Sequence, residues 1–84
     1  MVEEIKLIGG VITMMRGHLA TFSSEINDDE LRPIATNLVK MIHRGDSKMA
    51  LEQYVGTELN KLSAAPNPYA AIVGEACVLV KNSK

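Results

Sequence analysis

The side chains best suited to acid–base chemistry or metal binding are two histidines, His18 and His43, and the single cysteine, Cys77. A neutral imidazole is a common metal ligand and proton carrier, and a thiolate is a strong nucleophile. Neither histidine stands in a His-x-x-x-His or Glu-x-x-His pattern, and His43 falls where a helix end favours a cation. Cys77 lies among apolar residues, with Lys81 as its one nearby cation, which predicts a small core side chain. We therefore expect no catalytic residues, no metal ligands, no cofactor and no enzymatic activity.

The tetrapeptide Arg44-Gly45-Asp46-Ser47 combines two short motifs. Arg-Gly-Asp occurs in cell-adhesion ligands, and Gly-Asp-Ser before a helix resembles the phosphopantetheine attachment motif of acyl carrier proteins. Lys48 follows the serine here, where that family has an apolar residue. Glycine commonly ends a helix, and aspartate or serine commonly begins one. We therefore predict that Gly45 ends one helix and that Asp46 or Ser47 caps the next.

Four segments are predicted to be helices from the spacing of their apolar residues and from their end signals. Between residues 5 and 22, apolar residues follow in steps of three and four, which places them along one side of a helix. A second helix is expected over residues 27–43, with Asn27 among its candidate caps and Pro33 in or just after its first turn. A third should end near Ala64, and a fourth should run from Pro68 to about Lys81. We therefore predict one all-α domain over residues 1–84, an antiparallel bundle of about four helices.

Two segments leave an α+β alternative open. Residues 5–14 contain Gly9-Gly10 between β-branched residues, which suits a two-residue hairpin turn, and residues 71–80 are rich in valine. An N-terminal hairpin and a C-terminal strand would then replace the first and fourth helices. The heptad spacing continues through both glycines without a change of phase, which favours the helical interpretation.

A contact surface is predicted from the first and fourth helices. Gly10, Gly17 and Ser24 recur every seven residues opposite the apolar stripe of the first helix. Each glycine costs roughly 1 kcal/mol relative to alanine inside a helix, so this side either serves close approach by another helix or is merely kinked or frayed. The apolar residues of the fourth helix point around it, and a chain this short has little core to hide them. We expect a partner or self-association interface formed by Ile72, Val73, Val78, Leu79, Val80, Gly10 and Gly17.

Composition favours a protein-binding function. The chain is 46% hydrophobic with a formal net charge of -1, unlike a disordered tail or a basic nucleic-acid binder. A small DNA-binding regulator remains an alternative, because five cations could line two neighbouring helices, although no helix-turn-helix spacing is present. These cations are Arg32, Lys40, Arg44, Lys48 and Lys61. We expect a non-enzymatic regulator, inhibitor or adaptor that binds another protein through an apolar helix face and forms a homo-oligomer, most simply a dimer.

A resemblance in spacing gives a further alternative. It covers residues 29–63, and the matching positions are Glu30-Leu31-Arg32, Leu38, Met41-Ile42, Arg44-Gly45, Leu51, Val55 and Leu59. This pattern is similar to the central helices of small bacteriocin immunity proteins. The resemblance implies a four-helix bundle with an immunity-like function.

The cellular location is predicted from the apolar runs, the cysteine count and the N-terminal residues. The longest apolar run near the C-terminus, from Tyr69 to Val80, is interrupted by Glu75 and is too short to span a bilayer. A single cysteine permits no internal disulfide, and the chain begins with Glu3 and Glu4 instead of a basic leader. We therefore expect a cytoplasmic protein without a membrane span.

Overall fold

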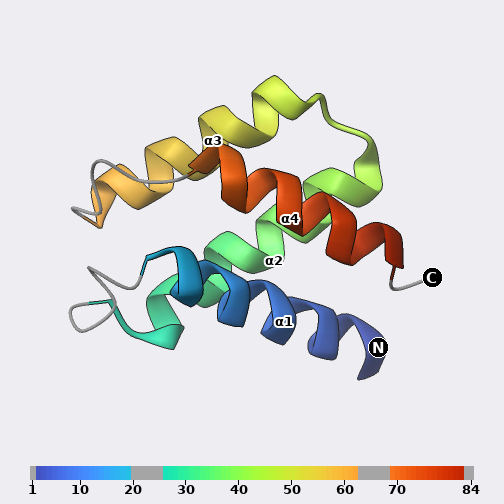
Figure 1. Cartoon of the computed structure of the whole chain (residues 1–84), viewed down its shortest axis with the longest axis horizontal. Helices are drawn as coiled ribbons and strands as arrows, with labels where there is room; N and C mark the ends of the chain where they lie inside the picture. Colours follow the sequence, from blue (N-terminus) through green and yellow to red (C-terminus); the bar gives the residue numbers. More distant parts are fainter. Residues whose placement is uncertain (1, 20–25, 63–68, 83–84) are drawn as a thin grey trace.

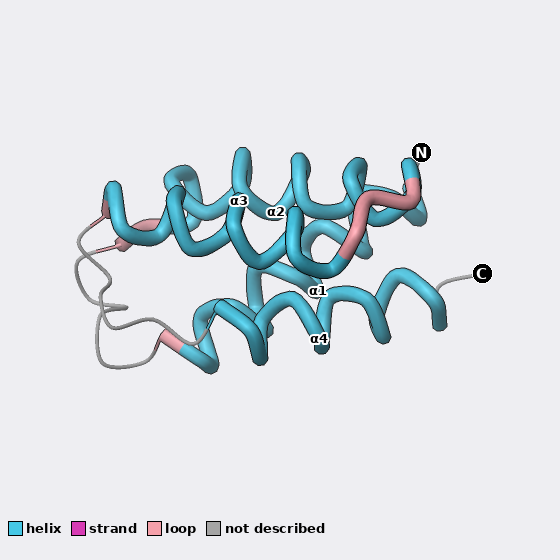
Figure 2. The backbone as a smooth tube through the Cα atoms, turned by 90° about the horizontal axis from the view of Figure 1, so that it is seen from above, coloured by secondary structure: helices cyan, strands magenta, loops and turns pink. Residues whose placement is uncertain are grey.

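The computed structural model describes residues 2–19, 26–62 and 69–82. These ranges hold four α-helices and no strand: α1 (Val2–His18), α2 (Asp28–Arg44), α3 (Lys48–Lys61) and α4 (Tyr69–Asn82) (Figure 1, Figure 2). The predicted all-α bundle is confirmed. The α+β alternative is wrong, because α1 continues through both glycines at 9–10 and α4 includes the valine-rich segment 71–80. The roles expected for Ser24 and Pro68 lie outside the described ranges.

The central helices of the bundle are α2 and α4, because each of them contacts all three other helices. The described parts of α1 and α3 share no contact and lie on opposite sides of this central pair. Figure 1 shows α4 in front of α2, with α3 above and α1 below. The start of α1 and the end of α4 lie at the same end of the molecule, so these two neighbouring helices run in opposite directions (Figure 1).

The core is built from apolar side chains of all four helices, and no polar or charged residue is buried in the described ranges. Because α4 packs against three neighbours, it needs apolar side chains on most of its circumference. This packing explains why α4 carries so little charge. The largest fully buried side chains are Met15, Leu19, Leu31, Leu38, Leu59, Ile72, Val11, Val39, Val55 and Val73.

Local hydrogen bonds define the ends of α2 and α3. The Asn27 side chain accepts a hydrogen bond from the Glu30 amide at 2.9 Å, and the Glu30 carboxylate accepts one from the Asn27 amide at 3.3 Å. This reciprocal pair is a capping box. Gly45 ends α2 with φ at 88°, a left-handed conformation that favours glycine. Ser47 Oγ accepts a hydrogen bond from the Ala50 amide at 3.2 Å, so the predicted stop and cap are both confirmed.

Pro33 lies in the second turn of α2, just beyond the positions where a missing amide costs little. It is the sixth residue of the helix that starts at Asp28, beyond the first amides, which have no intrahelical acceptor. The missing amide of Pro33 would have donated to the carbonyl of Asp29. Both residues are exposed, so water can reach the region of that carbonyl.

An ion pair between Arg44 and Asp46 closes the corner between α2 and α3. Arg44 Nε donates to Asp46 Oδ1 at 2.9 Å, and this hydrogen bond is the main reason that the pKa of Asp46 lies below its ordinary value. A carboxyl group with a lowered folded-state pKa stabilises the fold above its unfolded-state pKa. That contribution is lost as the pH falls through the lowered value. Because Arg44 is largely exposed, the contribution is small.

Candidate functional site

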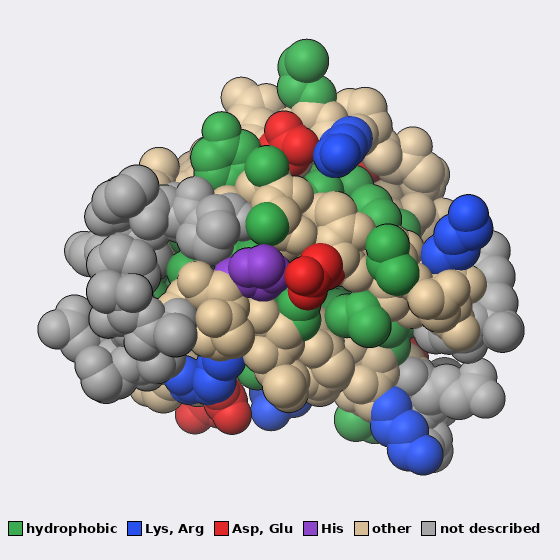
Figure 3. Space-filling model, viewed as in Figure 1, with side chains coloured by type: hydrophobic (Ala, Val, Ile, Leu, Met, Phe, Trp, Pro, Cys, Tyr) green, Lys and Arg blue, Asp and Glu red, His purple; other side chains and the backbone are tan. Residues whose placement is uncertain are grey.

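An apolar groove lies between α1 and α4 on the face of the molecule that Figure 3 shows. It encloses about 380 Å³, and its most exposed apolar side chain, Val78, has 55% of its surface accessible. Hydrophobic side chains gather on this face around a histidine that lies beside a carboxylate (Figure 3). We call this hollow the α1–α4 groove. Its lining residues are Gly10, Thr13 and Met14 from α1, and Glu75, Val78 and Leu79 from α4.

The wall formed by α1 is apolar although it contains a threonine. Thr13 Oγ1 donates a hydrogen bond to the carbonyl of Gly9 at 3.0 Å, so its hydroxyl is satisfied within the helix. Gly10 contributes no side chain, and Met14 is half-buried against the core. The α1 wall therefore offers little polar surface that a partner would have to desolvate.

The wall formed by α4 has one charged side chain, at Glu75. The distance from His18 Nε2 to Glu75 Oε1 is 3.2 Å, so this contact joins the end of α1 to α4. The two side chains are 27% and 57% exposed, which makes the contact a surface interaction of small energy. Glu75 is therefore the one acidic group in a groove that is otherwise apolar.

Three residues of the predicted interface belong to the core. Ile72, Val73 and Val80 have exposed fractions of 0%, 0% and 3%. This burial corrects the expectation that another molecule covers them. The physical reason is that α4 contacts three helices, so one chain covers side chains that point in several directions around α4.

The other four residues of the predicted interface remain at or near the surface. Gly10, Val78 and Leu79 line the α1–α4 groove together, and Gly17 is exposed near the end of α1. A Cβ atom built on Gly10 or Gly17 would meet no atom of the described residues within 4 Å. The packing among the described residues therefore does not require glycine at either position.

The sequence did not single out three residues of the groove. Met14 and Thr13 carry no signal of their own in the first helix, and Glu75 stands out only as the interruption of an apolar run. No sequence signal could have found them, because they come together only through the antiparallel pairing of the first and fourth helices, and a single sequence does not reveal that pairing. Tertiary packing brings these three residues beside Val78.

We expect Gly10→Ala to raise the free energy of unfolding by roughly 0.5–1 kcal/mol. The new methyl group meets no neighbour, and alanine lowers the entropy cost of forming the helix. Gly45→Ala is the control, because φ at 88° makes a side chain strained there, and we expect it to be destabilising. Urea denaturation at low protein concentration measures both. Destabilisation by Gly10→Ala would mean that another part of the chain packs against this side of α1.

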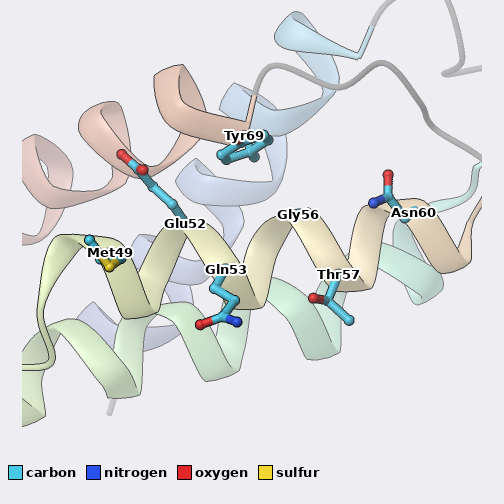
Figure 4. A pocket seen from close by; sticks show the side chains of 7 residues that line it. All are labelled: Met49, Glu52, Gln53, Gly56, Thr57, Asn60 and Tyr69. Carbon is cyan, nitrogen blue, oxygen red and sulfur yellow. The ribbon is translucent and has the colours of Figure 1, made fainter.

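A second hollow, the α3 hollow, lies along α3 beside the start of α4. It encloses about 470 Å³, and Figure 4 shows Tyr69 above α3 near Gly56, with the other lining side chains carried by α3. A Cβ on Gly56 would lie 3.6 Å from the Tyr69 ring, an ordinary contact distance. The α3 hollow presents mostly polar side chains and serves below as a comparison surface. It is lined by Met49, Glu52, Gln53, Gly56, Thr57, Asn60 and Tyr69.

The side chains considered first for chemistry lie in separate places. His18 contacts Glu75, His43 is exposed near the end of α2, and Cys77 is half-buried against the core. Ser47 is occupied as the cap of α3. In the described part of the chain, no three or more histidine, cysteine, aspartate or glutamate side chains are grouped to hold a metal ion.

Two of the five cations considered for DNA binding pair with nearby acids. Arg44 contacts Asp46, and Lys61 Nζ lies 3.0 Å from Glu58 Oε2. Arg16 donates to the Ile26 carbonyl at 2.7 Å and also contacts an acid at the start of α2. Arg16, Arg44 and Lys61 are therefore used in local contacts.

No protein-family model, curated protein or solved structure matches this chain. Among the described helices, none is long and apolar enough to cross a membrane.

Proposed function

We propose that this protein is a non-enzymatic protein-binding module, a small regulator, inhibitor or adaptor that binds through the α1–α4 groove. The observation that carries the proposal is Val78, which is 55% exposed in an apolar groove while Ile72 and Val73 on the same helix are fully covered. An isolated exposed valine is ordinary. Val78 differs from an isolated exposed valine because Gly10 and Leu79 line the same groove and extend the apolar surface.

The groove suits a helix of a protein better than a small polar ligand. Small-molecule sites usually combine an apolar lining with several polar groups that fix the ligand's orientation. Here Glu75 is the one charged lining group, and the hydroxyl of Thr13 is already bonded to the backbone. A helix with an apolar stripe needs few polar contacts, and the missing side chain at Gly10 permits close approach.

Self-association is part of this proposal. A symmetric dimer covers the same surface on both copies and is the commonest closed arrangement of soluble oligomers. A standard interface takes about 800 Å² from each partner, roughly a sixth of the 5145 Å² that this chain exposes. One helix stripe is too narrow for that area, so both walls of the groove must take part. A cytoplasmic location completes the proposal, supported by the single cysteine.

The substitution Val78→Glu tests the groove. It introduces a charge at a surface position, so we expect the helical content to stay unchanged and the dimer to dissociate. Analytical ultracentrifugation at high micromolar concentration gives the oligomeric state, and far-ultraviolet circular dichroism gives the helical content. Met49→Glu is the matched control, because Met49 is 78% exposed in the α3 hollow.

The wild-type protein, Val78→Glu and Met49→Glu also serve as baits that capture other proteins. We expect captured partners to be lost from the Val78→Glu bait and kept by the Met49→Glu bait. Equal capture by all three baits, together with unchanged self-association, would exclude the groove as the binding surface. A lyase, transferase or hydrolase activity in the purified protein would exclude the non-enzymatic class.

A further inference from the structure

We infer that the occupant of the α1–α4 groove is α4 of a second copy, antiparallel to the first and centred on Val78, so that Glu75 of each copy faces the partner's Lys81. This inference rests on the proposed function and specifies its partner and register. It follows from the order of charges around Val78 on the exposed side of α4.

The exposed side of α4 forms a stripe with helical spacing. Ala71, Val78 and Lys81 are linked through the adjacent residues Gly74 and Glu75 by separations of three or four, so all five lie on one side of the helix. Gly74 is half-buried, no atom of residues 2–19, 26–62 or 69–82 lies within 4 Å of a Cβ built there, and the other members are exposed. Gly74 has no side chain, so another helix can approach closely at that level. The stripe consists of Ala71, Gly74, Glu75, Val78 and Lys81.

The charges on this stripe are arranged symmetrically about Val78. Glu75 precedes it by three residues and Lys81 follows it by three. At 1.5 Å per residue, each charged residue lies about 4.5 Å from Val78 along the axis, on opposite sides. An antiparallel second copy centred on Val78 therefore places Lys81 opposite Glu75 twice, once at each end of the contact.

These two charges lack a partner within α4 itself. Six residues separate them, whereas side chains on a helix pair at a separation of three or four. Lys81 makes no ion pair with any residue in the described ranges, and Glu75 contacts His18, which is charged only when protonated. An apolar centre flanked by opposite charges is complementary to a copy of itself, which is the property that a two-fold interface requires.

The groove supplies the remaining contact area. A second α4 that lies beside the first also faces α1, because α1 and α4 are neighbours across the groove. Gly10 and the methyl group of Thr13 then meet the incoming helix without a bulky side chain between them. By symmetry, each α4 occupies the groove of the other copy.

Two charge reversals, Glu75→Lys and Lys81→Glu, test the register. Each variant alone places like charges opposite each other at both ends, and we expect its dimer to weaken about tenfold relative to wild type. An equimolar mixture of the two variants places opposite charges at both ends again. We expect this mixture to form a heterodimer with a dissociation constant within about threefold of the wild-type value. Sedimentation equilibrium of each variant and of the mixture measures this.

The matched control is Lys40→Glu, an exposed charge reversal on α2 that should leave the dimer unchanged. Glu75→Lys removes the contact with His18, whereas Lys81→Glu leaves that contact in place. If only Glu75→Lys weakens the dimer, the effect comes from the contact with His18, and the register is overturned. A wild-type dimer that Val78→Glu disrupts and both charge reversals leave intact would overturn the register but not the proposed function. A wild-type monomer at high micromolar concentration would overturn the second copy as occupant, while capture by the baits still tests binding to another protein.

Discussion

Leu38→Ala and Leu59→Ala are each expected to lower the free energy of unfolding by about 2–5 kcal/mol. Both side chains are 0% exposed, and they come from α2 and α3, whose buried faces meet in the core. Removing most of either side chain loses its burial and leaves a cavity that the surrounding helices fill only in part. A bundle of this size has a small total stability, so a loss of this magnitude is a large part of it.

Equilibrium urea denaturation measures these losses, and Lys61→Ala is the control. Lys61 is exposed and pairs with Glu58 three residues away, so its removal should change the free energy of unfolding by less than about 0.5 kcal/mol. Similar losses for all three variants would show that the buried faces of α2 and α3 are assigned incorrectly.

Val73→Asp is expected to prevent cooperative folding. Val73 is 0% exposed on a helix that contacts three others, and no cation is buried in the described core to pair with a carboxylate. An ionised side chain there would lose its hydration without compensation, which costs several kcal/mol or more. That penalty is comparable to the whole stability expected of so short a chain.

Thermal unfolding followed by circular dichroism tests this expectation, with Val78→Glu as the matched comparison. Both substitutions introduce a carboxylate in place of a valine on α4, but Val78 is 55% exposed. We expect a cooperative transition for Val78→Glu and a broad or absent one for Val73→Asp. Cooperative unfolding of Val73→Asp near the wild-type temperature would contradict the placement of Val73 in the core.

Local sequence signals were sufficient for the four helices and for three of their ends, whereas α3 ends at Lys61 and not near Ala64 as expected. Asn27, Gly45 and Ser47 act within a few residues of their own positions, through caps and a left-handed turn, so the sequence alone predicts them. The steps of three and four through Gly9 and Gly10 likewise distinguished α1 from a hairpin. These features depend on bonds and contacts between near neighbours in the chain.

Tertiary structure decides which apolar residues of α4 are buried and which stay exposed. Ile72, Val73 and Val78 are similar in type and lie within seven residues, so their composition cannot tell which of them are covered. Packing against three helices buries the first two and leaves Val78 at the edge of the groove. The groove itself joins residues more than sixty positions apart in the chain. A contact at that separation depends on how whole helices pack, which local spacing does not encode.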